Sequence, residues 1–229
     1  MKKILMICFS LFIVFGIIGC ATNTSKNDND KTTTERKSNL DIKTDDKSLV
    51  VYFSVPETDN PDNMSSEEEY STVVIDGKVL GNTQYLANVI QEYVAADIFR
   101  IEPVTPYPMN HDELEKVATN EKRNNERQNI AAKIENIDQY GVIFVGFPNW
   151  YSDMPMIMYS FFEEYDLTDK TIIPFTTSGA SGFSNNISTI QELQPNAKVV
   201  ENGLSILRNE IDDSKSVIID WLNELGYKN

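Results

Sequence analysis

Residues 142–151 read VIFVGFPNWY. The first part of this stretch, Val142–Phe147, is an apolar run in which hydrophobic and polar side chains do not alternate. Such a run is typical of a strand that is buried on both faces, as in a parallel sheet covered by helices. Two large aromatic residues follow the run after Pro148 and Asn149. The stretch therefore predicts a buried central strand with an aromatic loop at its carboxyl end.

Similar runs occur along the rest of the chain, and helical patterns separate them. We expect strands at 49–53, 98–101, 142–147, 171–176 and 198–200, the last extending towards 207. We expect helices near 83–95, 113–136, 155–165, 186–193 and 210–225. This alternation predicts an α/β fold with a doubly wound, five-stranded parallel sheet and helices on both faces. Ligands of such sheets bind beyond the carboxyl ends of the strands, where the strand order reverses.

The N-terminus has the layout of a secretion signal. Lys2 and Lys3 precede the apolar run Ile4–Ile18, which is short for a membrane span. The run is followed by Gly19-Cys20, which resembles the lipobox of bacterial lipoproteins, where cleavage leaves a lipid-bearing cysteine. We expect a signal peptide at 1–19, lipidation of Cys20 and a position on the outer face of the cytoplasmic membrane. An uncleaved anchor and an ordinary signal peptide are the alternatives.

The composition separates a polar segment from a folded domain. Residues 20–47 are almost wholly polar, which predicts a disordered tether between the lipid anchor and the domain. Residues 48–229 form the domain and hold 12 basic and 29 acidic residues, a net charge of −17. This charge argues against a nucleic acid as partner and favours basic partners. The domain has no cysteine, which excludes thiol chemistry, disulfides and cysteine zinc sites, and we expect no metal.

The residues after the first strand could form a binding site for a phosphate group. Ser54 follows this strand, and the next helix opens with Gly81, Asn82 and Thr83. A helix N-terminus can hold a phosphate through its free N–H groups, although such residues are often only helix caps. The intervening residues 55–80 form an insertion, in which an Asp-Gly pair between apolar runs predicts a hairpin. The P-loop and dinucleotide-binding glycine motifs are absent from the sequence, which disfavours ATP and NAD as primary ligands.

Two further loops complete the expected site. The loop after the third strand has polar and aromatic residues suited to a flat ring, or to packing under the next helix: Pro148, Asn149, Trp150 and Tyr151. The loop after the fourth strand has small residues whose backbone can approach a ligand edge closely, or it is a flexible surface loop: Thr177, Ser178, Gly179 and Gly182. The single histidine, His111, is expected to be an exposed polar residue, and we expect no catalytic side chain.

With these loops in place, the chain resembles the flavodoxins, specifically the FMN-binding flavodoxin-like lipoproteins of Gram-positive bacteria. The resemblance extends from Leu49 to the C-terminus and includes YFS at 52–54, LGNT at 80–83, PYP at 106–108, GFPNWY at 146–151, FEEYDL at 162–167, KTIIPF at 170–175 and TSGASG at 177–182. It implies a flavodoxin-like fold. Relatives often have His-Gly-Gly where this chain has residues 178–180, and a second tryptophan where Tyr151 stands.

The resemblance also implies a role for each loop. Ser54, Asn82 and Thr83 would hold the FMN phosphate. Residues 148–151 would border the isoalloxazine, with Trp150 stacking on it, and residues 177–182 would border its pyrimidine side. The departure at residues 178–180 leaves the flavin affinity open.

Three functions remain open from the sequence. The leading one is a membrane-anchored electron carrier that binds FMN and exchanges electrons with a redox protein bearing a basic docking face. The flavin would do the chemistry, and the acidic domain would disfavour its anionic reduced form. The second is an FMN-dependent NAD(P)H or quinone oxidoreductase on the same fold. The third is a non-redox surface lipoprotein that has lost the flavin.

Overall fold

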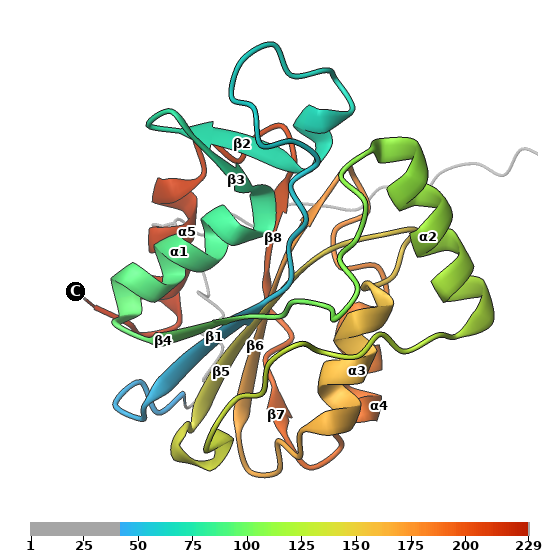
Figure 1. Cartoon of the computed structure of the whole chain (residues 1–229). Coiled ribbons are helices and arrows are strands. Elements are labelled where there is room, and N and C mark those ends of the chain that lie inside the picture. Colours follow the sequence, from blue (N-terminus) through green and yellow to red (C-terminus); the bar gives the residue numbers. More distant parts are fainter. Residues whose placement is uncertain (1–41, 229) are drawn as a thin grey trace, which may run out of the picture. The chain divides into compact units, whose positions relative to one another are not determined.

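The computed structural model describes residues 42–228 (Figure 1). The expected signal peptide, Cys20 and the tether up to residue 41 lie outside the described residues. The end of the expected tether belongs to the domain, because Ile42 is 9% exposed and joins a hydrophobic core. The sequence did not indicate that Ile42 belongs to the domain, because Ile42 is an isolated apolar residue in a polar stretch. Within residues 42–228, no helix is both long enough and apolar enough to cross a membrane.

A parallel sheet forms the centre of the domain. Its strands are β1 (Ser48–Tyr52), β4 (Asp97–Arg100), β5 (Val142–Pro148), β6 (Thr171–Ser178), β7 (Lys198–Val199) and β8 (Leu204–Leu207). The order is β4-β1-β5-β6-β7, and β8 also pairs with β6. The order therefore reverses at β1, which lies between β4 and β5. The predicted doubly wound parallel fold is confirmed.

The fifth predicted strand is interrupted. β7 pairs with the beginning of β6, and β8 pairs with its end. The interruption lies beside Ile173 and Pro174, and proline has no N–H to donate to a strand ladder. Gly203 passes so close to β6 that a Cβ atom on it would lie 2.5 Å from the carbonyl oxygen of Pro174. The chain bends away there and returns to the sheet as β8.

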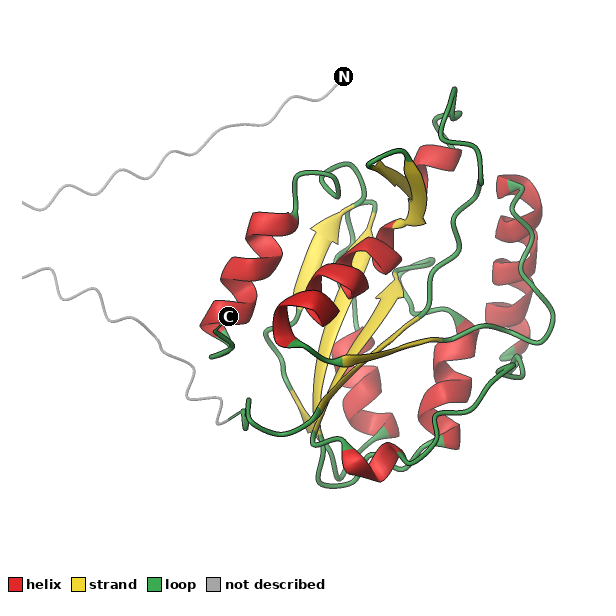
Figure 2. Cartoon of the chain, turned by 60° about the vertical axis from the view of Figure 1, so that its left-hand side comes forward, coloured by secondary structure: helices red, strands yellow, loops and turns green. Residues whose placement is uncertain are grey.

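Helices cover both faces of the sheet (Figures 1 and 2). One face carries α1 (Asn82–Val94) and α5 (Lys215–Glu224), and the other carries α2 (His111–Asn124), α3 (Met156–Glu164) and α4 (Asn186–Leu193). Successive residues of β1 point to opposite faces, so Val50 packs in the core under α1 while Val51 packs in the core under α3. Burial on both faces explains why the strands are apolar without alternation.

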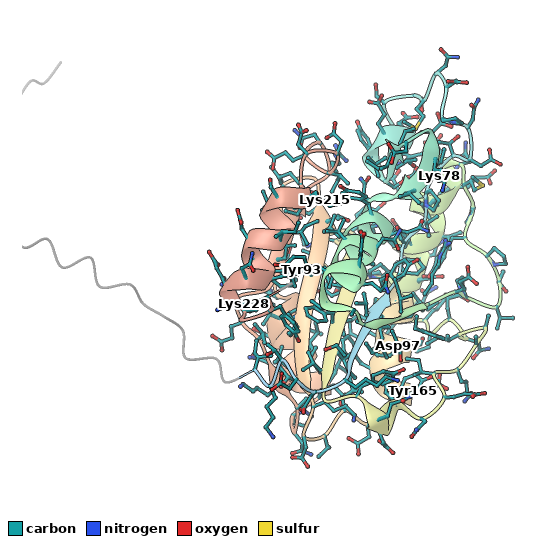
Figure 3. All side chains as sticks on the ribbon, turned by 90° about the vertical axis from the view of Figure 1, so that its left-hand side faces the viewer. Lys78, Tyr93, Asp97, Tyr165, Lys215 and Lys228 are labelled. Atoms are coloured by element: carbon teal, nitrogen blue, oxygen red, sulfur yellow. The ribbon has the colours of Figure 1, made fainter. Side chains whose placement is uncertain are left out.

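The packing of α1 against α5 is visible in Figure 3, where Tyr93 lies between the two helices. The hydroxyl group of Tyr93 donates a hydrogen bond to Asn223 Oδ1 at 2.8 Å. In the same view, Lys78 lies at the opposite end of the domain from Asp97, the first residue of β4. Lys78 therefore marks the end of the domain at which the parallel strands finish.

The second predicted helix is shorter than expected. It begins at His111, where Asn110 Oδ1 accepts a hydrogen bond from the N–H of Glu113, and it ends at Asn124. Asn125 adopts a left-handed backbone with φ 52° and caps the helix, as asparagine often does at this position. The prediction of a helix up to residue 136 was wrong because the polar, charged pattern continues beyond this cap.

The insertion stands over the carboxyl ends of the strands (Figure 1). It contains the short helix η1 (Glu68–Tyr70) and an antiparallel pair, β2 (Thr72–Ile75) and β3 (Lys78–Gly81). The turn between β2 and β3 is the Asp-Gly pair, and both residues have positive φ, as two-residue hairpin turns of type I′ require. The insertion is therefore a folded segment beside the carboxyl ends of the strands.

Candidate functional site

A pocket lies at the carboxyl ends of β1, β5 and β6, beside the N-terminus of α1. Among the residues that line it are nine that the sequence analysis singled out: Ser54, Asn82, Thr83, Pro148, Asn149, Trp150, Thr177, Ser178 and Gly179. These residues lie at the start of α1, at the ends of β5 and β6 and in the loops that follow β1, β5 and β6, which are far apart in the sequence. The topology brings them together because parallel strands end at the same edge of the sheet.

The α1 end of the pocket depends on a close contact between Ser54 and Gly81. A Cβ atom on Gly81 would lie 2.1 Å from the hydroxyl oxygen of Ser54, so this position requires glycine. The first N–H groups of a helix have no acceptor within the helix. The N–H of Asn82 donates to the carbonyl oxygen of Ser71 in the insertion, at 2.8 Å. The N–H groups of Thr83 and Gln84 also lie in the first turn of α1 and could donate to an anionic ligand.

Hydroxyl groups join the loops at the floor of the pocket. The Oγ1 atoms of Thr83 and Thr177 form a buried hydrogen bond of 2.8 Å between α1 and β6. The carbonyl oxygen of Thr177 accepts a hydrogen bond of 2.8 Å from the N–H of Asn149 in the loop after β5. The neighbouring Thr176 donates its hydroxyl to the carbonyl oxygen of Phe147 at 2.7 Å. These bonds fix the ends of β5 and β6 and the start of α1 relative to one another.

Two amide side chains present unsatisfied oxygens in the lining. Asn82 donates its Nδ2 to the carbonyl oxygen of Tyr70, and Asn149 donates its Nδ2 to the carbonyl oxygen of Gly182 at 2.6 Å. The Oδ1 atom of each is buried and has no hydrogen-bond partner among residues 42–228. Buried acceptors without a partner are costly and uncommon. A ligand that brings hydroxyl or N–H donors would satisfy both oxygens.

Trp150 is held by aromatic neighbours under the pocket. Its ring contacts those of Phe53 and Tyr107 edge to face, with centroids 5.5 Å and 5.6 Å away. Tyr107 donates its hydroxyl to Glu121 Oε2 at 2.8 Å, and Gln128 donates to the other carboxylate oxygen at 2.6 Å. Burial raises the pKa of both the Glu121 carboxyl and the Tyr107 hydroxyl. The half-buried indole thus rests on a buried, hydrogen-bonded support.

Two predicted site residues do not line the pocket. Tyr151 is 47% exposed, and its carbonyl oxygen accepts a hydrogen bond from Lys122 Nζ at 2.7 Å. A tight turn closed by hydrogen bonds between the backbones of Trp150 and Asp153 carries Tyr151 to this outer position. Gly182 has a supporting place instead, because its N–H donates to Ser178 Oγ at 3.0 Å and its carbonyl oxygen orients Asn149.

The structure adds residues that the sequence analysis did not assign to the site. Glu57, Tyr70 and Ser71 of the insertion also line the pocket, together with His111 and Arg208. His111 Nδ1 lies 2.6 Å from Glu57 Oε2, so His111 is a paired residue at the pocket rather than the exposed residue we expected. The Arg208 guanidinium stacks on the Tyr70 ring at 3.5 Å. The insertion thus contacts both His111 and Arg208.

One of these residues could have been found from the sequence. Arg208 directly follows β8, and the expected fifth strand extended towards residue 207. The rule that selected the other loops also points to the residue after this strand. The sequence did not indicate that His111 and Tyr70 reach the pocket, because their positions depend on the path of the loops.

Comparisons with known proteins agree with this architecture. A family model described as flavodoxin matches residues 71–225. A candidate flavoprotein from Bacteroides eggerthii is 28% identical with a TM-score of 0.56, over 80% of this chain and 99% of that chain. A candidate flavoprotein from Bacteroides uniformis is 24% identical with a TM-score of 0.57, over 78% of this chain and 98% of that chain. Comparison with curated proteins finds no match.

Proposed function

The chain belongs to the flavodoxin family, and from this premise we propose that it binds FMN in the pocket at the carboxyl ends of β1, β5 and β6. The observation that carries the proposal is the pair of buried, unpartnered amide oxygens of Asn82 and Asn149 in the lining of that pocket. A flavin mononucleotide brings ribityl hydroxyl groups, a ring N–H and a phosphate. The hydroxyl groups and the ring N–H are donors for these two oxygens, and the phosphate is an acceptor for the N–H groups at the start of α1.

Each part of the lining has a role in this proposal. Ser54, Thr83 and the N-terminus of α1 hold the phosphate through hydroxyl and N–H donors. Trp150 provides an aromatic surface for the ring, and Asn149 and Ser178 border its polar edge. Arg208, which stacks on Tyr70, lies in the same lining and supplies a positive charge near the phosphate. The sequence alone did not predict any cation at this site.

We propose further that the protein carries electrons. When bound, FMN supplies one- and two-electron chemistry, and the protein binds, orients and partly covers it. Membership of the flavodoxin family supports this proposal. The charge of −17 on residues 48–229 favours a basic redox partner. Lipidation of Cys20 would hold the carrier at the outer face of the cytoplasmic membrane.

Electron transfer to a basic haem protein tests this function. The FMN-loaded full-length chain is reduced photochemically without oxygen and mixed with oxidised mitochondrial cytochrome c, a basic haem protein. We expect haem reduction in proportion to the flavin supplied. Failure to reduce the haem contradicts the carrier function. Steady consumption of NADH or NADPH by the purified chain with a quinone, in the absence of a protein partner, would instead show an oxidoreductase.

A further inference from the structure

A second pocket lies beside the first one, at the carboxyl ends of β1 and β4. It has a volume of about 320 Å³, within the range of about 300–1,000 Å³ that is typical of small-molecule sites. Ser54 and Val55 line both pockets. Phe53 and Tyr107 line the second pocket and contact Trp150, which lines the first. The two pockets are therefore neighbours that share Ser54 and Val55 and have contacting aromatic side chains between them.

The walls of the second pocket are mainly apolar. Its lining includes the buried side chains of Ile101 and Phe53, three proline rings and the exposed side chain of Met109. Met109 is 44% exposed, so its side chain is accessible from this pocket. Flat proline and aromatic surfaces suit a planar apolar molecule. The walls alone do not determine which polar groups this molecule carries.

The polar group that the ligand carries can be inferred from Arg100. Its terminal Nη2 donates a hydrogen bond to the carbonyl oxygen of Ser54 at 3.2 Å, which orients the guanidinium. Its Nε is buried and has no hydrogen-bond partner among residues 42–228. Glu102 Oε1 lies 3.6 Å from Nε, beyond hydrogen-bond distance, and the Glu102 side chain is 62% exposed. Arg100 lines the pocket, and its Nε is an N–H donor for which a ligand could supply the acceptor.

The charge of the surroundings decides between an anionic and a neutral acceptor. Glu102 already balances the charge of Arg100, and the domain as a whole carries a net charge of −17. An anion would meet the Glu102 carboxylate and the field of the domain. A neutral carbonyl oxygen accepts from Nε without either cost. We propose that the second pocket binds a neutral, planar aromatic carbonyl compound, the class that includes quinones, with a carbonyl oxygen on Arg100 Nε.

Binding of menadione to the full-length chain without flavin tests this proposal. Menadione is neutral and planar, carries two carbonyl groups, and quenches tryptophan fluorescence. We expect saturable quenching of Trp150, whose ring contacts Phe53 and Tyr107 of the lining, while Trp221 in the other core reports no binding. A Trp150→Phe variant should therefore lose the saturable signal. Quenching that never saturates in the wild-type chain overturns the proposal.

Variants identify the pocket that is occupied. Arg100→Met removes the donor and keeps the length of the side chain, and should weaken menadione binding roughly ten-fold or more. Ala131→Leu places extra carbons in the pocket from an exposed position and should also weaken binding. The matched control is Arg123→Met, which removes a charge from the exposed face of α2 and should leave binding unchanged. Equal weakening in the control, or no weakening in the other two variants, contradicts the proposal.

Addition of FMN separates this proposal from the proposed function. Menadione should bind the FMN-loaded chain and the flavin-free chain with the same affinity, because the two ligands occupy different pockets. Competition between them would place menadione in the first pocket and overturn the second site. Failure of FMN to bind would overturn the proposed function only, since menadione binding is measured without flavin.

Discussion

Trp150 lines the flavin pocket while its neighbour Tyr151 lies outside. We therefore predict that Trp150→Ala weakens FMN binding by about 1–3 kcal/mol, because the ring loses a stacking surface. Tyr151→Ala is the matched control and should change the affinity little. Titration of FMN fluorescence measures both. Equal losses in the two variants would show that Tyr151 also contacts the ring and that the described loop conformation is not the one that binds.

Glu121 is a carboxyl group that the structure keeps almost fully buried, at 2% exposure. Burial raises its pKa, so the folded state favours the protonated form. Stability from this group is complete below the ordinary pKa of glutamate and is lost as the pH rises through the raised value. The slope is at most about 1.4 kcal/mol per pH unit.

Denaturant unfolding at a series of pH values checks this prediction. Glu121→Gln cannot ionise, so the stability of the wild-type chain relative to this variant should decrease as the pH rises across that window. Glu92→Gln, an exposed change on α1, should show no such trend relative to the wild-type chain. A constant difference between wild type and Glu121→Gln at all pH values would contradict the prediction.

At the scale of elements, the insertion that carries η1, β2 and β3 partly covers the flavin pocket. Tyr70 connects it to Arg208 through ring stacking and to His111 through an edge contact with centroids 5.8 Å apart. We predict that Tyr70→Ala accelerates FMN release several-fold, because these contacts must open before the ligand leaves. Stopped-flow displacement of FMN measures the rate. Glu69→Ala, an exposed change next to Tyr70, should leave it unchanged, and equal rates in both variants would rule out a covering role.

The elements differ in how well the sequence predicts them. The strands β1, β5 and β6 were predictable because burial on both faces leaves a continuous apolar run. The length of α2 was not predictable, because the helix ends at the left-handed cap at Asn125 while the charge pattern continues. The interruption between β7 and β8 was also missed, because it depends on the proximity of Gly203 to Pro174 in the folded sheet.

The residues of the candidate site also differ in how well the sequence predicts them. Residues at or directly after the ends of strands could be placed from topology, which accounts for seven of the nine predicted residues in the lining, and the other two, Asn82 and Thr83, were placed from the helix N-terminus. Residues that reach the pocket through loops or long-range pairing could not, as for the Glu57–His111 pair. Tyr151 was misplaced because the turn that carries it away requires positive φ at two residues other than glycine, Tyr151 and Ser152. Such backbone conformations are rare and give little signal in a sequence.

At the scale of the whole molecule, the acidic charge governs association. If the net charge of −17 on residues 48–229 guides a basic redox partner, the rate of haem reduction by the FMN-loaded chain should decrease as the salt concentration rises. Stopped-flow absorbance of cytochrome c at increasing sodium chloride measures this dependence. An acidic haem protein is the control and should react more slowly at low salt. A rate that is independent of salt for both would show that charge does not guide the encounter.

FMN binding itself is the central claim, and retention of FMN after dialysis tests it most directly. The full-length chain is mixed with excess FMN, dialysed exhaustively, and examined by visible absorbance and flavin fluorescence. We predict a yellow protein with about one quenched flavin per chain, and a melting temperature above that of the flavin-free chain, because a ligand of the native state stabilises it. A colourless, well-folded protein with the same melting temperature before and after FMN addition would contradict the account.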